Sequence, residues 1–156
     1  MTKTLLLPLA LLTSFQVLAE EEQSDFTFGV GLGSLYSGLG ANFGVRTDTD
    51  FKYVSAGCMA YSTLYGEACG VGVGWVNTDT FDFQTSNHGI GYYLGIVGSE
   101  REYYSDYKPV YGAGLGYHYF FNGINNSGFN VGVTGVVGVD HNSIGFGTLL
   151  QIGYQF

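Results

Sequence analysis

Two residues near the C-terminus, His141 and Ser143, have the types and spacing that nucleophilic catalysis requires. A histidine can act as the base that removes the proton from a serine hydroxyl, which makes the serine a nucleophile. Because one residue separates them, both side chains project to the same face of an extended chain. Asp140 would project to the opposite face, where it could not easily orient the histidine. The pair is therefore a weak catalytic candidate, and an ordinary connecting loop is the interpretation that we favour.

Other motifs do not meet the requirements of a cofactor or metal site. The repeat Gly29-x-Gly31-x-Gly33 suggests a dinucleotide fingerprint, but that motif must open a helix after a strand, and here the alternation continues. Asp48 and Asp50 form a DxD pattern, which is more typical of a turn than of a metal site. We therefore expect no cofactor and no metal. We also expect no nucleic-acid partner, because a chain with a net charge of −8 offers no basic patch.

The N-terminus has the features of a cleaved secretory signal peptide. Lys3 provides the positive charge, Leu5 to Leu12 form the apolar core, and Ala19 ends a small-residue cleavage pattern. The apolar run is too short for a membrane-spanning helix, which needs about 20 residues. We therefore predict a signal peptide over residues 1–19 and a single domain over residues 20–156.

The composition is unusual for a soluble domain. Hydrophobic residues make up 46% of the chain and charged residues only 12%, whereas soluble domains have about 25% charged residues. Glycine occurs 26 times and proline only twice, so the composition is neither that of a collagen nor that of a linker. The shortage of charge favours a surface that faces lipid.

Alternation with a period of two residues recurs along most of the chain. It is clearest over residues 144–156, where apolar side chains occupy one face of the strand and small or polar ones the other. Eight strands are predicted, over residues 26–35, 39–47, 51–61, 69–76, 88–97, 110–121, 129–139 and 144–156. Their spacing is typical of the smallest outer-membrane barrels, but also of a soluble barrel or sandwich.

The two faces of the predicted strands decide between these architectures. One face carries β-branched and aromatic residues, and the other is almost entirely glycine. A row of glycines cannot make an outer surface soluble, so we place it inside; the apolar row then faces outward, which only lipid tolerates. A closed barrel also leaves no unpaired strand edge in the membrane. The sequence therefore predicts an all-β fold, a single closed antiparallel up-and-down transmembrane β-barrel of about eight strands.

Aromatic residues cluster at both predicted ends of the strands, as they do in membrane barrels. The predicted periplasmic girdle consists of Phe26, Phe28, Phe51, Trp75, Phe121, Phe129, Tyr154 and Phe156. The predicted outer girdle consists of Tyr36, Tyr61, Tyr65, Tyr103, Tyr104, Tyr107 and Tyr111. Arg46 and His118 are expected to point into a hydrated lumen. The glycine rows would leave that lumen poorly filled, with Tyr93 and Phe120 among its few large side chains.

Cys58 and Cys69 are predicted to form a disulfide, because they flank one hairpin and the periplasm is oxidising. A register that places them opposite one another leaves Ser62–Tyr65 as a four-residue loop. The same register brings Tyr53 across from Gly74, so that a tyrosine covers a strand glycine. The alternative is two free thiols that face lipid.

The C-terminal strand resembles the terminal strand of bacterial outer-membrane β-barrels, in which a final phenylalanine and alternate apolar residues form the assembly signal. The matching residues are Leu150, Ile152, Tyr154 and Phe156. The resemblance extends to the architecture of the whole mature chain and implies a monomer in the outer membrane of a Gram-negative bacterium. It also implies three partners: outer-membrane lipid, lipopolysaccharide and the outer-membrane assembly machinery.

The pair His141 and Ser143 is similar to one in a family of small outer-membrane barrels that deacylate lipid A, where the histidine is the base and the serine the nucleophile. Here Ile144 follows the serine where that family has an asparagine, and no acidic residue follows Asp140. A lipid-A-directed hydrolase is thus the alternative to our first hypothesis, a non-enzymatic barrel with a structural or surface-interaction role. A narrow channel is the third hypothesis, although side chains normally fill eight-stranded barrels.

The connection over residues 98–109 is the most highly charged loop of the chain. Loops on a rigid scaffold commonly carry function, so this loop is where we expect a surface partner to bind. The residues expected to make those contacts are Arg101, Tyr103, Tyr104, Tyr107 and Lys108. The two cations could meet lipopolysaccharide phosphates; the alternative is a solvated loop with an interfacial girdle.

Overall fold

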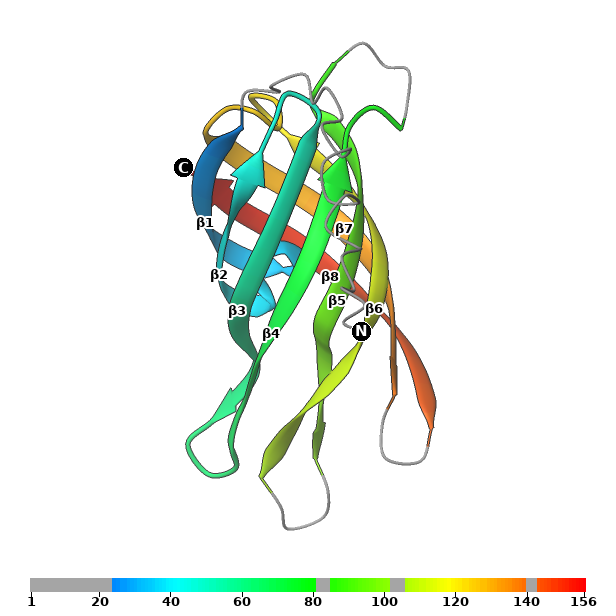
Figure 1. Cartoon of the computed structure of the whole chain (residues 1–156). Helices are drawn as coiled ribbons and strands as arrows, with labels where there is room; N and C mark the ends of the chain where they lie inside the picture. Colours follow the sequence, from blue (N-terminus) through cyan, green and yellow to red (C-terminus); the bar gives the residue numbers. More distant parts are fainter. Residues whose placement is uncertain (1–23, 81–84, 102–105, 140–142) are drawn as a thin grey trace, which may run out of the picture.

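The chain forms a closed, eight-stranded antiparallel β-barrel in a computed structural model that describes residues 24–80, 85–101, 106–139 and 143–156 (Figure 1). Each strand pairs with its neighbours in sequence, and β8 pairs with β1 to close the sheet. The strands are β1 (Asp25–Gly33), β2 (Gly38–Arg46), β3 (Asp50–Ser62), β4 (Gly66–Asn77), β5 (His88–Arg101), β6 (Tyr107–Phe120), β7 (Gly128–Val139) and β8 (Ile144–Gln155). The predicted fold class is confirmed, and a sandwich is excluded. The predicted signal peptide lies outside the described residues.

The alternation of the sequence separates an apolar outer surface from a polar interior. Val54, Val71 and Leu115 are 56% to 62% exposed on the outside of the wall. Polar side chains that point inward are no more than 5% exposed; they are Thr27, Asn42, Ser55, His118, Asn130, Thr134, Gln151 and Gln155. The barrel therefore has the reverse of the arrangement that burial of apolar surface produces in a water-soluble protein.

The two ends of the barrel differ. One end, called here the terminal end, carries the start of β1 and the C-terminus. At the other, the hairpin end, β3, β5 and β7 end and β4, β6 and β8 begin, on the side of the barrel away from the C-terminus (Figure 1). Several aromatic rings of the predicted periplasmic girdle do form an outer rim at the terminal end, where Phe28 stacks on Phe156 with ring centroids 4.6 Å apart. Phe51 is an exception, because it points inward, is 1% exposed and stacks on Tyr53.

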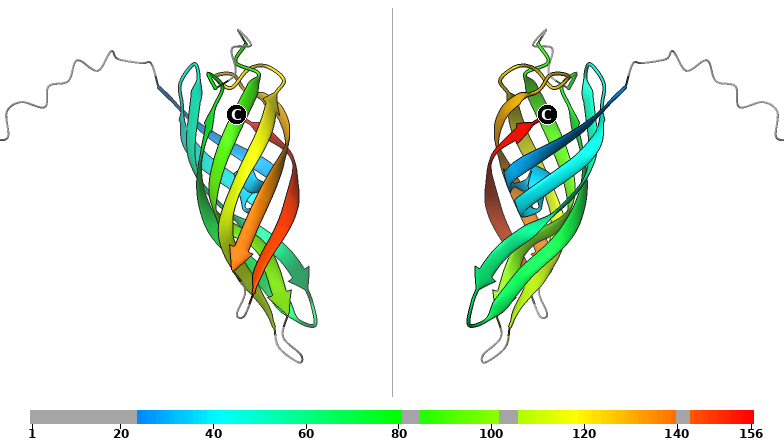
Figure 2. Two further views of the ribbon diagram at one scale, coloured as in Figure 1. Left: turned by 90° about the vertical axis from the view of Figure 1, so that its right-hand side faces the viewer. Right: turned by 90° about the vertical axis from the view of Figure 1, so that its left-hand side faces the viewer.

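The β1–β2 connection does not project from the hairpin end but folds into the barrel. Its residues Ser34–Tyr36 form a single 3₁₀ turn, η1, which lies inside the barrel (Figure 2), and all three side chains are buried. Gly33 and Gly38 flank the turn with φ angles of 111° and 96°, which glycine adopts without strain. The prediction that Tyr36 belongs to the outer girdle is therefore wrong, because this residue fills the lumen.

Two β-bulges shift the strand faces at the hairpin end. One lies between Cys58 and Ala60, so Ser62 pairs with Gly66 and the β3–β4 loop is shorter than the predicted four residues. The other lies between Ile96 and Gly98. An extra residue in one strand changes the direction of the following side chains. Ile96, the last residue before the second shift, is buried although it continues the alternate row of Ile90, Tyr92 and Leu94.

The β-barrel is fully paired only in part of its length, because β1 and β2 have nine residues each and the others have 12 to 14. β4 pairs with β5 only from Gly72 onward, and β6 pairs with β7 only from Gly112 onward. Beyond these points β3 to β8 continue as three hairpins. We call the fully paired part the closed section. The remainder, residues 59–71, 96–101, 107–111 and 144–150, is the split section.

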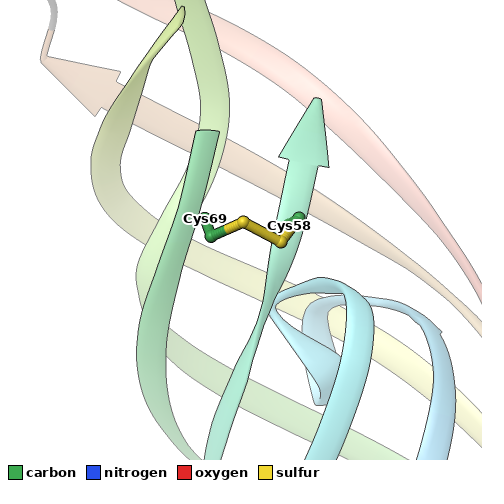
Figure 3. Close-up of a disulfide and its surroundings, with 2 residues drawn as sticks. All are labelled: Cys58 and Cys69. Carbon is green, nitrogen blue, oxygen red and sulfur yellow. A yellow bond between two sulfur atoms is a disulfide. The ribbon is translucent and has the colours of Figure 1, made fainter. Parts of the chain in front are cut away.

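The predicted disulfide between Cys58 and Cys69 is confirmed and joins β3 to β4 where the closed section ends (Figure 3). The predicted register is also confirmed below the bulge, with Cys58 opposite Cys69 and Tyr53 opposite Gly74. The alternative of two free thiols is excluded. The bond covalently links the two strands of the hairpin at the base of its free part.

Candidate functional site

The lumen of the closed section is filled by η1 and the polar side chains that hold it. The side-chain amide of Asn130 donates from Nδ2 to the hydroxyl of Tyr36, at 2.7 Å. The Oδ1 atom of Asn130 accepts a 3.0 Å hydrogen bond from Nε2 of Gln151. Ser34 Oγ lies 2.7 Å from the hydroxyl of Thr134. These partners belong to β7 and β8, the two strands that follow β1 around the closed barrel on the side away from β2. The turn is thus anchored to the wall beside β1, and buried polar groups find the partners they need.

A second group of hydrogen bonds attaches the end of the same connection to β3 and β5. The Ser37 hydroxyl lies 2.8 Å from Ser55 Oγ and 3.0 Å from the Tyr93 hydroxyl. Asn42 donates to the backbone carbonyl of Leu35. Strands from all sides of the barrel therefore contact the β1–β2 connection, which acts as an internal plug.

The inward glycine rows make space for large rings from neighbouring strands. A Cβ atom on Gly74 would collide with the ring of Tyr53, and one on Gly72 would collide with the ring of Tyr93. The predicted covering of Gly74 by Tyr53 is confirmed. The expectation of a poorly filled lumen is wrong, because it did not include the rings and the plug that occupy the glycine space.

The two charged or titratable groups predicted to point inward occupy different depths. His118 is 2% exposed and lies beside Gln151. Arg46 is at the terminal end, directly across the ladder from Asp25. Its Nε and Nη1 atoms are buried and have no hydrogen-bond partner among the described residues. Arg46 therefore marks the boundary between the packed lumen and the terminal opening.

The hairpin end contains a recess of about 220 Å³. Its lining residues come from β5 to β8 and are Val97, Gly98, Ser99, Val110, Val136, Gly138, Gly145, Phe146 and Gly147. A Cβ atom on Gly145 would meet nothing within 4 Å, and one on Gly147 would only touch Val136, at 3.5 Å. Unlike the closed section, this part of the interior has room, and Ser99 is the one lining residue with a polar side chain.

The β3–β4 and β5–β6 hairpins contact each other near their tips. The guanidinium of Arg101 lies 3.7 Å from the ring centroid of Tyr65, and the amide of Tyr107 donates to the carbonyl of Tyr65. Lys108 is exposed on the same hairpin. Tyr103 and Tyr104, which were predicted to contact a surface partner together with Arg101, Tyr107 and Lys108, lie outside the described residues. The role of the group in partner binding stays a prediction.

The weak catalytic candidates cannot be assembled from the described residues. Ser143 is exposed and directly precedes β8, whereas His141 and Asp140 lie outside the described part of the chain. One cluster with metal-ligand atoms occurs among the described residues, formed by Cys58, Glu67 and Cys69. Its two sulfur atoms are joined in the disulfide, so they are not available as thiolate ligands.

The four residues of the predicted assembly signal lie on the outer face of β8. Leu150, Ile152 and Phe156 are exposed, and Tyr154 packs edge-on against Phe129, with ring centroids 5.1 Å apart. The terminal residue is fixed by its amide, which donates to the carbonyl of Phe28, and by Thr27, whose hydroxyl donates to its carbonyl. The four residues of the predicted signal therefore lie on a regular, hydrogen-bonded strand end. Recognition of this strand by the assembly machinery stays a prediction.

No family model matches this chain, and no curated protein or solved structure matches it either. None of the described residues forms a helix that is long and apolar enough to cross a membrane.

Sequence reasoning missed the plug and the recess. The plug had a visible signal, because Ser34 to Ser37 interrupt the alternation between Gly33 and Gly38. That signal predicts a turn, but it does not say that the turn folds inward. No short stretch of sequence indicated the recess, because the recess depends on where the pairing between neighbouring strands ends.

Proposed function

We propose that this chain is a non-enzymatic, integral outer-membrane β-barrel with a structural or surface-interaction role. The observation that carries the proposal is the inverted wall, which has an apolar outer surface around a polar, hydrogen-bonded interior. In water, a continuous apolar belt of this size would promote aggregation. Lipid accepts such a belt, and the strands of the closed section satisfy one another's backbone groups, as the hydrocarbon region requires.

In this proposal the hairpin end faces away from the cell, and its side chains provide the surface contacts. Tyr61 and Leu64 are 75% and 80% exposed there. Arg101, held over Tyr65, and Lys108 add positive charge that can bind lipopolysaccharide phosphates. The plug argues against a conducting role, because Leu35 and Tyr36 are completely buried in the lumen.

An arginine placed at two depths tests the membrane position. Val71 is on the outer face in the middle of β4, and Leu64 lies in the β3–β4 loop. We expect Val71→Arg to destabilise the barrel in lipid vesicles by about 2–4 kcal/mol and Leu64→Arg by about 0–1 kcal/mol, since the cost of a lipid-facing charge depends on its depth. The measurement is reversible unfolding in vesicles, followed by the different gel migration of folded and boiled protein. Equal effects of the two substitutions would contradict the proposal, as would a folded, monodisperse protein in buffer without detergent.

A further inference from the structure

We propose that the recess at the hairpin end binds a hydrocarbon chain of a membrane lipid, which enters sideways past the edge of β8. The inference rests on the proposed membrane position. It concerns a ligand site that is separate from the polar lumen and from the exposed hairpin tips.

The edge of β8 that points away from β7 is open at the level of the recess. β1 pairs with β8 only from Leu32 opposite Ile152 to Gly29 opposite Gln155. No described strand pairs with this edge over Ile144–Leu150. The inward face of this segment carries Gly145 and Gly147, which are both exposed although they point toward the barrel interior. Because no described strand pairs with this edge, and because Gly145 and Gly147 have no side chains to block it, the recess is open from the side between the strands.

The interior of the recess is suited to hydrocarbon. Val97 and Val136 form its inner wall and are 8% and 7% exposed, and Val110 packs against the same cluster. Ser99 is the one polar side chain among the nine described residues that line it. The lining side chains therefore offer a polar ligand little beyond Ser99, whereas burial of apolar surface would favour a hydrocarbon chain.

The recess is also continuous with the surface that faces lipid in our proposal. A groove of about 460 Å³ on the outside of β6 to β8 shares Val136, Phe146 and Gly147 with the recess. Phe146 is 86% exposed, and Val139 and Ile144 carry the apolar outer surface further toward the hairpin end. Lipid chains would therefore surround the β7–β8 hairpin at the level of the recess, with only the free edge of β8 between them and its interior.

Photolabelling tests the proposal directly. The mature chain would be refolded in phosphatidylcholine vesicles that contain phosphatidylcholine with a diazirine on one acyl chain, and the labelled residues mapped by mass spectrometry. We expect label on the outward residues Phe146 and Leu150 and also on the inward residues Val97 and Val110. Thr134, which is buried in the lumen, gives the background.

A matched pair of substitutions separates entry into the recess from contact with the outside. Gly147→Leu fills the recess and should lower the labelling of Val97 and Val110 several-fold while Leu150 keeps its label. Gly135→Leu makes the same change on the outer face, where a Cβ atom would meet only a carbonyl oxygen at 3.9 Å, and should leave the inward labelling unchanged. Both variants would first be checked for the gel migration of folded protein.

If Leu150 were labelled while Val97 and Val110 stayed at background, the lipid-chain proposal would be overturned and the membrane position would remain intact. No label on Leu150 or Phe146 would instead contradict the proposed function itself. Cross-linking of two copies along Ile144–Leu150, with the inward residues at background, would show that a second strand covers the edge, and would also overturn the proposal.

Discussion

In the closed section of the barrel every strand is hydrogen-bonded to two neighbours, whereas toward the hairpin end the pairing of β4 with β5, of β6 with β7 and of β8 with β1 stops before the strands end. The interiors differ in the same way. In the closed section, Tyr36, Asn130 and Gln151 form part of a hydrogen-bonded network that links η1 to β7 and β8. In the split section the interior contains a recess lined mainly by valines and glycines.

This contrast follows from the lengths of β1 and β2. The chain that would have extended these strands is used instead for the plug, so one segment both fills the closed section and leaves the edges of β3 and β8 without a partner in the split section. Strand segments with fewer hydrogen-bonded neighbours unfold locally more easily, and ligand-binding segments are often of this kind. The comparison therefore predicts a rigid scaffold at one end and ligand contacts at the other.

The largest expected effect is the loss of a plug side chain. Tyr36→Ala removes a fully buried ring and two hydrogen bonds to Asn130, and we expect the free energy of unfolding to fall by about 3–5 kcal/mol, as for other large buried aromatic residues. Tyr65→Ala, in the split section, should lower it by no more than about 1 kcal/mol, the usual value of an exposed cation–π contact. Chemical unfolding in detergent micelles measures both. Similar losses for the two variants would mean that the plug is not the core of the scaffold.

Removal of the disulfide should have an intermediate effect. Cys58 and Cys69 are 11 residues apart, and the chain-entropy model gives about 3 kcal/mol for a 15-residue loop, so this is the upper limit that we expect for the double Cys→Ser variant. The increase in protease sensitivity should be confined to the β3–β4 hairpin, because the bond lies where that hairpin leaves the closed section. A variant in which β1 or β8 is cleaved as early as this hairpin would show that the bond also supports the closed section.

The smallest effect is expected from adding one methyl group to an inward glycine. Gly74→Ala places a Cβ atom against the Tyr53 ring, and overpacking of this kind typically destabilises a protein by about 1–3 kcal/mol. Gly135→Ala is the control, because its Cβ atom would point outward into open space. Unfolding in micelles should separate the two variants. If Gly74→Ala were as stable as the control, the glycine rows would not be needed to accommodate the rings.

The barrel and its β3–β4 register could be predicted from the sequence because both depend on local alternation. A shift of one residue moves every side chain to the other face, so Tyr53, Ser55 and Cys58 together allow few registers. The disulfide could be predicted for the same reason, since Cys58 and Cys69 meet only in the register that also brings Tyr53 to Gly74.

The plug and the bulges could not be predicted because their causes are distant in sequence. The hydroxyl of Tyr36 finds its partner 94 residues away, on Asn130, and nothing near Tyr36 indicates that partner. The bulge after Ile96 leaves the alternation on either side of it intact, so the change of face becomes visible only when β5 is paired with β6. The candidate ligand site depends on both features, and for that reason sequence reasoning placed the function in the loops alone.

Amide hydrogen exchange of the protein in lipid vesicles tests the contrast between the two sections most directly. We predict slow exchange for the closed section, including Gly29–Leu32 and the paired amides of β2, and fast exchange along Ile144–Leu150 on the β8 edge that lacks a strand partner. Within β8 the change should fall near Gln151, where pairing with β1 begins. Uniform protection along the whole of β8 would contradict the account, because it would mean that the barrel is closed over its full length in the membrane.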